Sequence, residues 1–66
     1  MAVVKVIELM ADSPASWEDA AQVAIAKASK TISNIRAAYI KDHSVTVSDG
    51  KVISYRVTLK ISFEVE

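Results

Sequence analysis

The chain has 66 residues, with 8 basic and 8 acidic side chains, one histidine and no cysteine. This length allows one small domain, which we expect to span residues 1–66. A domain of this size is marginally stable alone, and scaffolds this small usually need a disulfide, a metal ion or partner chains. The absence of cysteine excludes disulfides and thiolate chemistry, and a single histidine argues against a structural zinc site. Association of several copies is therefore the expected source of stability.

The charge balance and the hydropathy pattern exclude further classes of function. The formal net charge is zero, so the sequence lacks the basic surface that nucleic-acid binding requires. No apolar run is long enough to span a membrane, and no secretory signal is evident at the N-terminus. We therefore expect a cytoplasmic protein with neither a nucleic-acid nor a membrane partner.

The first predicted element is a strand over Val3–Met10. Its sequence, VVKVIELM, is short and rich in β-branched residues, and residues 11–15 read as the loop that ends it. Lys5 and Glu8 fall on opposite faces of this strand. That pattern indicates a strand covered on both sides, or an edge strand buried against another chain.

A helix is predicted from Trp17 to Thr31. Ser16 is the expected N-cap, and Asp19 three residues later completes a capping-box-like pair. An apolar stripe rich in alanine recurs at helical spacing, which allows the helix to approach a sheet closely. The stripe consists of Trp17, Ala20, Ala21, Ala24, Ile25, Ala28 and Ile32.

The rest of the chain, from Ile35 onward, predicts a long β-hairpin. Asp49-Gly50 is the signature of a two-residue type I′ turn, and the last strand, Tyr55–Glu66, alternates between apolar and polar residues. Counting back from this turn gives a regular register. The predicted pairs are Ser48 with Lys51, Val47 with Val52, His43 with Arg56, Ile40 with Leu59 and Ala38 with Ile61.

This register separates two faces of the hairpin. The apolar face, which we expect to pack on the helix, carries Ala38, Ile40, Val57, Leu59, Ile61, Phe63 and Val65, with Asp42 near its end. The other face carries Ala37, Tyr39, Lys41, His43, Arg56, Thr58, Lys60, Ser62 and Glu64. The predicted fold class is α+β, with the order β-α-β-β and a three-stranded antiparallel sheet wrapped around one helix.

Catalytic chemistry is not indicated by the sequence. His43 stands between Asp42 and Ser44, but adjacent strand residues point to opposite faces, so these three cannot form a catalytic triad. We interpret His43 as a solvated strand residue and Trp17 as a core or interface residue. We expect no enzymatic activity.

The acidic residues allow a cation site only where several copies meet. One carboxylate repeated by three subunits would place three oxygen ligands around an axis, which suits a hard cation such as calcium or magnesium. Asp42, Glu64 and Glu66 are the candidates, because they end or flank the long strands.

Taken together, the segments VVKVIELMADSPASWEDAAQVAIAKA, SNIRAAYIKD and YRVTLKISFEVE resemble the dodecins over essentially the whole chain. Dodecins are small strand-helix-strand-strand proteins that assemble as hollow twelve-subunit shells. They bind and store flavin at subunit interfaces without catalysis. The resemblance therefore implies a homododecamer that binds a small ligand.

The resemblance also locates the family's flavin site and shows two departures from it. Ala37 stands where dodecins have a flavin-stacking tryptophan, and Arg56 stands where they have a glutamine that hydrogen-bonds the flavin ring. Tyr39 lies beside these positions on the same predicted face. In both departures the chain is similar to a dodecin subgroup that lacks the tryptophan and has a calcium-binding member.

Three hypotheses follow. The first is a dodecin-like shell that binds or stores a small ligand, with Ala37, Arg56 and Tyr39 at the flavin positions. The second is a cation-binding or structural shell without flavin. The third, from another class, is a small adaptor whose exposed sheet edge pairs with a partner protein.

Overall fold

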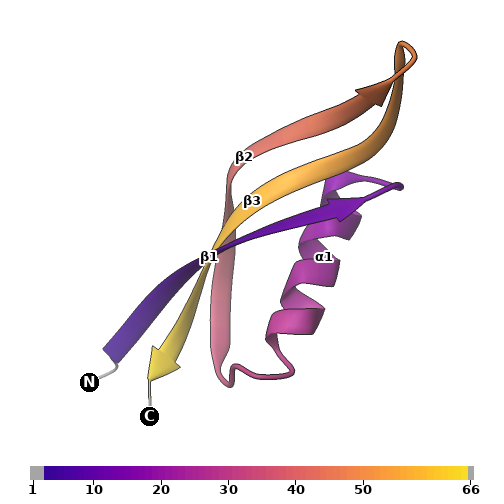
Figure 1. The fold of residues 1–66 in the computed structure, drawn as a ribbon. Coiled ribbons are helices and arrows are strands. Elements are labelled where there is room, and N and C mark those ends of the chain that lie inside the picture. The colour runs from indigo at the N-terminus through magenta and orange to yellow at the C-terminus, as the bar shows by residue number, and fades with distance from the viewer. Residues whose placement is uncertain (1–2, 66) are drawn as a thin grey trace.

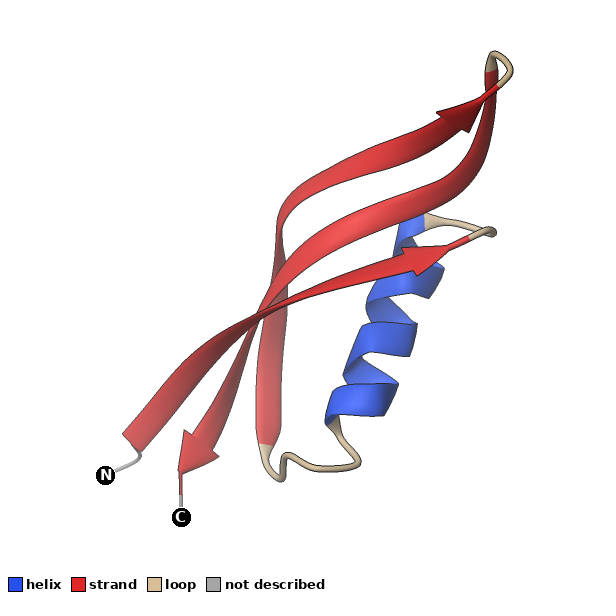
Figure 2. Ribbon diagram, in the orientation of Figure 1, coloured by secondary structure: helices blue, strands red, loops and turns tan. Residues whose placement is uncertain are grey.

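The computed structural model describes residues 3–65, which form one helix packed on one face of an antiparallel sheet. The elements are β1 (Val3–Ser13), α1 (Trp17–Ala28), β2 (Ile35–Ser48) and β3 (Lys51–Val65), with β3 in the centre of the sheet order β1-β3-β2. All three strands are long and strongly curved, and α1 lies on one side of them (Figures 1 and 2). The predicted α+β class and the β-α-β-β order are confirmed.

Strand β1 is longer than predicted, because residues 11–13 belong to the strand rather than to a loop. They continue the ladder with β3 until Ser13 pairs with Tyr55. Ser13 is buried, and its Oγ donates a 2.6 Å hydrogen bond to Asp19 while accepting one from the Ala15 amide. The pairing with β3 and the hydrogen bonds of Ser13 therefore hold residues 11–13 in a strand, although their sequence resembles a turn.

Helix α1 begins as predicted and ends earlier. The Oγ of Ser16 accepts a 2.9 Å hydrogen bond from the Asp19 amide, which confirms the N-cap. The helix ends at Ala28 instead of Thr31, because the amides of Lys30 and Thr31 bond three residues back in tight turns. Asn34, with a φ of 63°, then redirects the chain into β2.

The hairpin turn has the predicted geometry. Asp49 and Gly50 have φ values of 51° and 74°, as a type I′ turn requires, and Ser48 pairs with Lys51. Gly50 adopts this left-handed conformation without the steric cost that other residues have.

The hairpin register is interrupted at three positions, Arg36, Lys41 and Ile53, and the last two make part of the predicted register wrong. Ile53 is an extra residue on β3 and Lys41 is an extra residue on β2, so the segment between them is shifted by one position. His43 therefore pairs with Val57, and the predicted pairing with Arg56 does not occur. The predicted pairs of Ile40 with Leu59 and of Ala38 with Ile61 lie beyond the second bulge and are confirmed.

The same shift exchanges the faces of two candidate residues. His43 was expected on the face away from the helix, but it shares the helix side with Val57. Asp42 was expected on the helix side, but it pairs with Thr58 on the opposite side. A one-residue shift has this effect because side chains alternate between the faces along a strand.

The hydrophobic core is small and lies between α1 and the central strand. Its buried members are Ala20, Ala24, Val57, Leu59 and Ile61. The alanines allow the close approach of helix and sheet that the sequence predicted. Because α1 packs against β1 and β3, the apolar residues Ala38 and Ile40 of β2 stay exposed, contrary to the expectation that they pack on the helix.

The chain is elongated for its size. Its extents are 51 × 20 × 13 Å and its radius of gyration is 13.5 Å, whereas a compact domain of this length has about 11 Å. The hairpin extends beyond the helix at one end, and at the other end the start of β1 pairs with the end of β3, Val3 with Val65 (Figure 1). Within residues 3–65, α1 is too short to cross a bilayer.

Candidate functional site

The face of the sheet directed away from α1, here called the outer face, carries the candidate ligand residues. The alternation of side chains along each strand and the observed pairing identify the residues of this face. They are Glu8 and Asp12 of β1, Ala37, Tyr39 and Asp42 of β2, and Arg56, Lys60 and Glu64 of β3. The outer face is thus mainly polar along β2 and β3, whereas β1 adds the exposed apolar residues Val4, Val6 and Met10. The residues of β3 between the outer-face positions form the core.

Arg56 is held by a carboxylate of its own chain. It pairs with Asp12 in the ladder, and its Nε and Nη2 donate hydrogen bonds of 2.7 and 3.2 Å to the two carboxylate oxygens. This bond lowers the pKa of Asp12 and raises the pKa of Arg56. The Arg56 guanidinium therefore already has two of its donors engaged.

Ala37 and Tyr39 lie on the outer face of β2, as the sequence predicted. Ala37 pairs with Ser62, whose Oγ donates a 3.4 Å hydrogen bond to the Ala37 carbonyl oxygen. Tyr39 pairs with Lys60 and is 54% exposed. Ala37 has no ring on which an isoalloxazine could stack, so this position lacks the stacking side chain of a flavin sandwich.

The structure does not bring Ala37 and Arg56 together within one chain. The ladder partner of Ala37 is Ser62, six positions along β3 from Arg56. At about 3.4 Å per residue this corresponds to roughly 20 Å. A ligand that contacts both positions at close range would need two copies of the chain.

The carboxylates proposed as cation ligands are also far apart in one chain. Asp42 lies opposite Thr58, whereas Glu64 pairs with Val4 at the other end of β3. Glu66 lies outside the described residues. Within residues 3–65 no group of three or more potential metal ligands is found, whereas calcium takes about 6–8 oxygen ligands. A calcium site built from these carboxylates would therefore require several copies.

Ion pairs distinguish Asp42 from the other outer-face carboxylates. Glu64 accepts a 3.1 Å bond from Arg36, Glu8 accepts one of 3.1 Å from Lys41 across β3, and Asp12 is paired with Arg56. Asp42 has no ion-pair partner among residues 3–65. Its oxygens are exposed, so it is the outer-face carboxylate most accessible to a cation.

An aromatic cluster that the sequence did not predict lies on the helix side. Trp17 packs edge-on against His43 and Tyr55, with ring centroids 4.7 and 5.1 Å away. The Trp17 Nε1 donates a 2.9 Å hydrogen bond to the Ser44 carbonyl oxygen. The cluster forms because the shifted register turns His43 toward α1, and no local sequence signal reveals that shift. Trp17 is thus a half-buried packing residue, as expected, and His43 packs against a ring.

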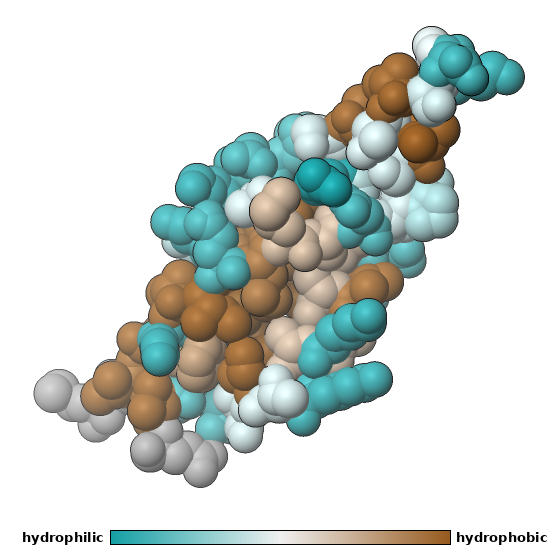
Figure 3. Space-filling view, in the orientation of Figure 1, coloured by the Kyte–Doolittle hydropathy of each residue, from teal (hydrophilic) through white to brown (hydrophobic). Residues whose placement is uncertain are grey.

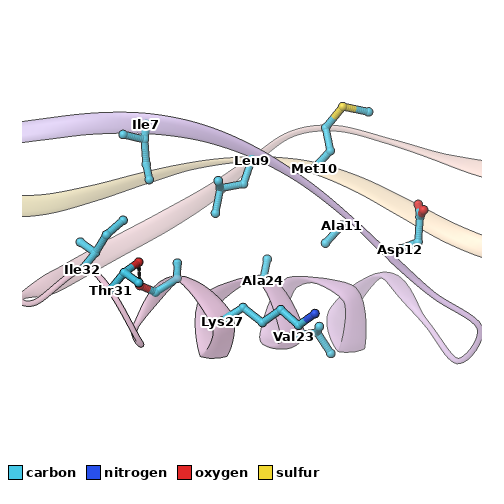
Figure 4. Close-up of a pocket in the computed structure, with 11 residues that line it drawn as sticks. Ile7, Leu9, Met10, Ala11, Asp12, Val23, Ala24, Lys27, Thr31 and Ile32 are labelled. Carbon is cyan, nitrogen blue, oxygen red and sulfur yellow. Dashed lines mark hydrogen bonds between the residues drawn. The ribbon is translucent and has the colours of Figure 1, made fainter.

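A groove opens between β1 and α1 on the helix side of the sheet. It encloses about 460 Å³ and is lined mainly by apolar residues, among them Ile7, Leu9, Ala24 and Ala28. Figure 4 shows Ile7, Leu9 and Ala11 directed toward the helix, whereas Met10 points away from it. Val23 and Lys27 of α1 also line the groove.

The fold and the strand-helix-strand-strand order define the class of the protein. The sequence model of the family described as Dodecin matches residues 3–66, and the chain belongs to this family. The family predicted from the sequence is therefore confirmed.

Individual dodecins are similar over nearly their whole length. The calcium dodecin of Mycobacterium tuberculosis is 38% identical over 64 residues, which cover 97% of this chain and 90% of the relative. Its crystal structure, described as that of a calcium-chelating antigen with a novel calcium-binding site, superposes with a TM-score of 0.85 at 37% identity, covering 97% of this chain and 91% of that one. An arginine-to-alanine variant of the Thermus thermophilus dodecin gives a TM-score of 0.94 at 32% identity, covering 100% and 98%.

Proposed function

We propose that this dodecin forms a homo-oligomeric shell, of twelve chains, that binds a small ligand without catalysis. The observation that carries the assembly is the large uncovered surface of the single chain. Its accessible area is 4714 Å², whereas a monomeric protein of this mass has about 4,100 Å². The excess, together with the thin core, supports a chain that completes its fold by associating with copies of itself.

The ligand we propose is calcium, in preference to flavin. The flavin positions offer no stacking ring at Ala37 and a guanidinium engaged by Asp12 at Arg56. The similarity to a relative named for calcium supports a cation. Asp42 is the proposed ligand residue, because its exposed carboxylate is free of ion pairs among the described residues. Copies of Asp42 from three subunits around an axis would supply three of the oxygens that calcium needs.

Calcium titration by calorimetry tests this proposal on protein freed of metal with a chelator. We expect the natural sequence to bind calcium and Asp42→Asn to lose most of that binding, because an amide carries no charge. Glu18→Gln is the matched control, since Glu18 is an exposed carboxylate in the first turn of α1. Unchanged binding in Asp42→Asn would reject Asp42 as a ligand. Glu64→Gln and Glu66→Gln would then be the next variants to examine.

Flavin binding is tested separately by titrating riboflavin and following its fluorescence. We expect no quenching at micromolar protein, because Ala37 has no ring and the Arg56 guanidinium is engaged by Asp12. Submicromolar binding would contradict this and would indicate Tyr39, whose exposed ring lies on the same face, as the replacement.

A binding role also agrees with the surroundings of the only histidine. His43 packs against Trp17, and the side chain of the neighbouring Ser44 lies on the opposite face of β2, where Ser44 pairs with Arg56. The histidine and the hydroxyl therefore cannot act together as base and nucleophile.

A further inference from the structure

The hairpin has an apolar surface on the helix side that α1 does not cover. We call it the bare strip, and its residues are Ile40, Val45, Val47 and Val52, which are 39–58% exposed. Figure 3 shows hydrophobic residues along the hairpin up to its polar tip. Water-exposed rows of β-branched residues of this kind mark a surface that another chain covers.

The groove between α1 and β1 is another unfilled apolar surface of the described chain. The alanines at positions 24 and 28 have small side chains, and this leaves room above Ile7 and Leu9. Val23 at the side of the groove is 39% exposed. The groove therefore has the depth and the polarity to receive β-branched side chains.

These two surfaces lie at opposite edges of one sheet. The strand order β1-β3-β2 places the groove at the β1 edge and most of the bare strip on β2, and both are on the helix side. One chain cannot bring its own strip to its own groove, since the central strand β3 separates them. A contact that joins the strip to a groove must therefore be made between copies, head to tail.

The uncovered area is of the size that such a contact needs. The chain exposes about 600 Å² more than a monomer of its mass. A standard interface removes about 800 Å² from each partner. One head-to-tail contact of standard size would thus remove at least the whole of this excess.

We propose that the bare strip of one copy docks in the groove between α1 and β1 of the next copy. The inference rests on the proposed function, which supplies the second copy, and it adds which surfaces meet. Because each copy offers one strip and one groove, repetition of the contact closes a ring of subunits when the rotation allows it.

Chemical cross-linking tests the pairing of these surfaces, since the chain has no native cysteine. Val47→Cys places a thiol on the strip, and Val23→Cys places one beside the groove. We expect a short bismaleimide to yield cross-linked dimers when the two variants are unfolded, mixed and reassembled, and far fewer when either is treated alone. Equal cross-linking of Val47→Cys alone would mean that strips meet strips, which would overturn the head-to-tail contact.

A pair of charge variants separates this inference from the proposed function. Val47→Asp puts a carboxylate on the bare strip, and Thr46→Asp puts one on the opposite face at the adjacent position. Light scattering is expected to show that Val47→Asp dissociates at concentrations where Thr46→Asp stays assembled. If the natural sequence is itself monomeric, the proposed function fails and the docking fails with it. If the natural sequence is assembled and both variants stay assembled, the proposed docking of strip in groove is wrong and the proposed function is unaffected.

Discussion

Replacement of Trp17 tests how much the aromatic cluster holds the hairpin to the helix. Trp17 is half buried, packs edge-on against His43 and Tyr55, and donates a hydrogen bond to the Ser44 carbonyl oxygen. Besides the hydrophobic core, these contacts join the start of α1 to both strands of the hairpin. Trp17→Ala removes all of them, whereas Trp17→Phe retains a ring and removes the indole donor.

The contacts of Trp17 set the expected magnitudes. Each edge-to-face ring pair contributes about 0.5–1.5 kcal/mol, and the indole hydrogen bond contributes about 1 kcal/mol. Because Trp17 is only half buried, we expect Trp17→Ala to cost about 3 kcal/mol, the lower limit for such truncations. Trp17→Phe is expected to cost about 1 kcal/mol, mainly for the lost hydrogen bond.

Urea denaturation followed by circular dichroism measures these free energies of unfolding. The total chain concentration must be the same for all variants, because association contributes to the apparent stability. A cost below about 0.5 kcal/mol for Trp17→Ala, the range of ordinary surface substitutions, would refute the structural role of the cluster. Equal costs for the alanine and phenylalanine variants would mean that the hydrogen bond, rather than ring packing, is what matters.

Three further predictions concern the core, the ion pair and the flavin positions. Leu59→Ala should cost about 2–5 kcal/mol in the same denaturation assay, because Leu59 is 1% exposed. Arg56 lowers the pKa of Asp12 in the folded chain, so the pair stabilises the fold above the ordinary pKa of Asp12 and is lost as pH falls through the lowered value. Stability measured below about pH 4 should therefore decline less in Asp12→Asn than in the natural sequence. The double change Ala37→Trp with Arg56→Gln should create riboflavin binding, measured by fluorescence quenching, and its failure would mean that the alignment of the flavin positions or the shared assembly is wrong.

Local signals in the sequence were sufficient to predict the order of the elements. The hairpin turn depends on two adjacent residues, Asp49 and Gly50, and the start of the helix depends on Ser16 and Asp19. Both features depend on interactions between residues only a few positions apart in the sequence. The strand-helix-strand-strand order and the antiparallel sheet followed from these signals and from the alternating pattern.

The bulges and their consequences could not be predicted by counting. Counting from the turn assumes that each residue of one strand pairs with one residue of the other. The extra residues Ile53 and Lys41 break this rule, and neither is a residue type that indicates a bulge. Their effect was to exchange the faces of Asp42 and His43. The correction brings Asp42 to the face where the other candidate ligands lie, and it places His43 against Trp17.

The electrostatic state of the candidate site also depends on tertiary structure. The sequence placed Arg56 on the outer face, but it did not reveal that Asp12 would lie opposite it, because residues 11–13 read as a loop. The longer β1 places Asp12 opposite Arg56, and the Asp12 carboxylate accepts two hydrogen bonds from the guanidinium. For Ala37 the sequence alone was sufficient, because the lack of an aromatic ring follows from the residue type.

Native mass spectrometry of protein prepared with and without calcium tests the central claim most directly. It reports the number of chains in the assembly and the ions that stay bound. We expect a particle of twelve chains that gains mass in steps of one calcium ion and carries no flavin. A well-folded single chain at micromolar concentration, or an assembly that holds flavin and takes up no calcium, would contradict it.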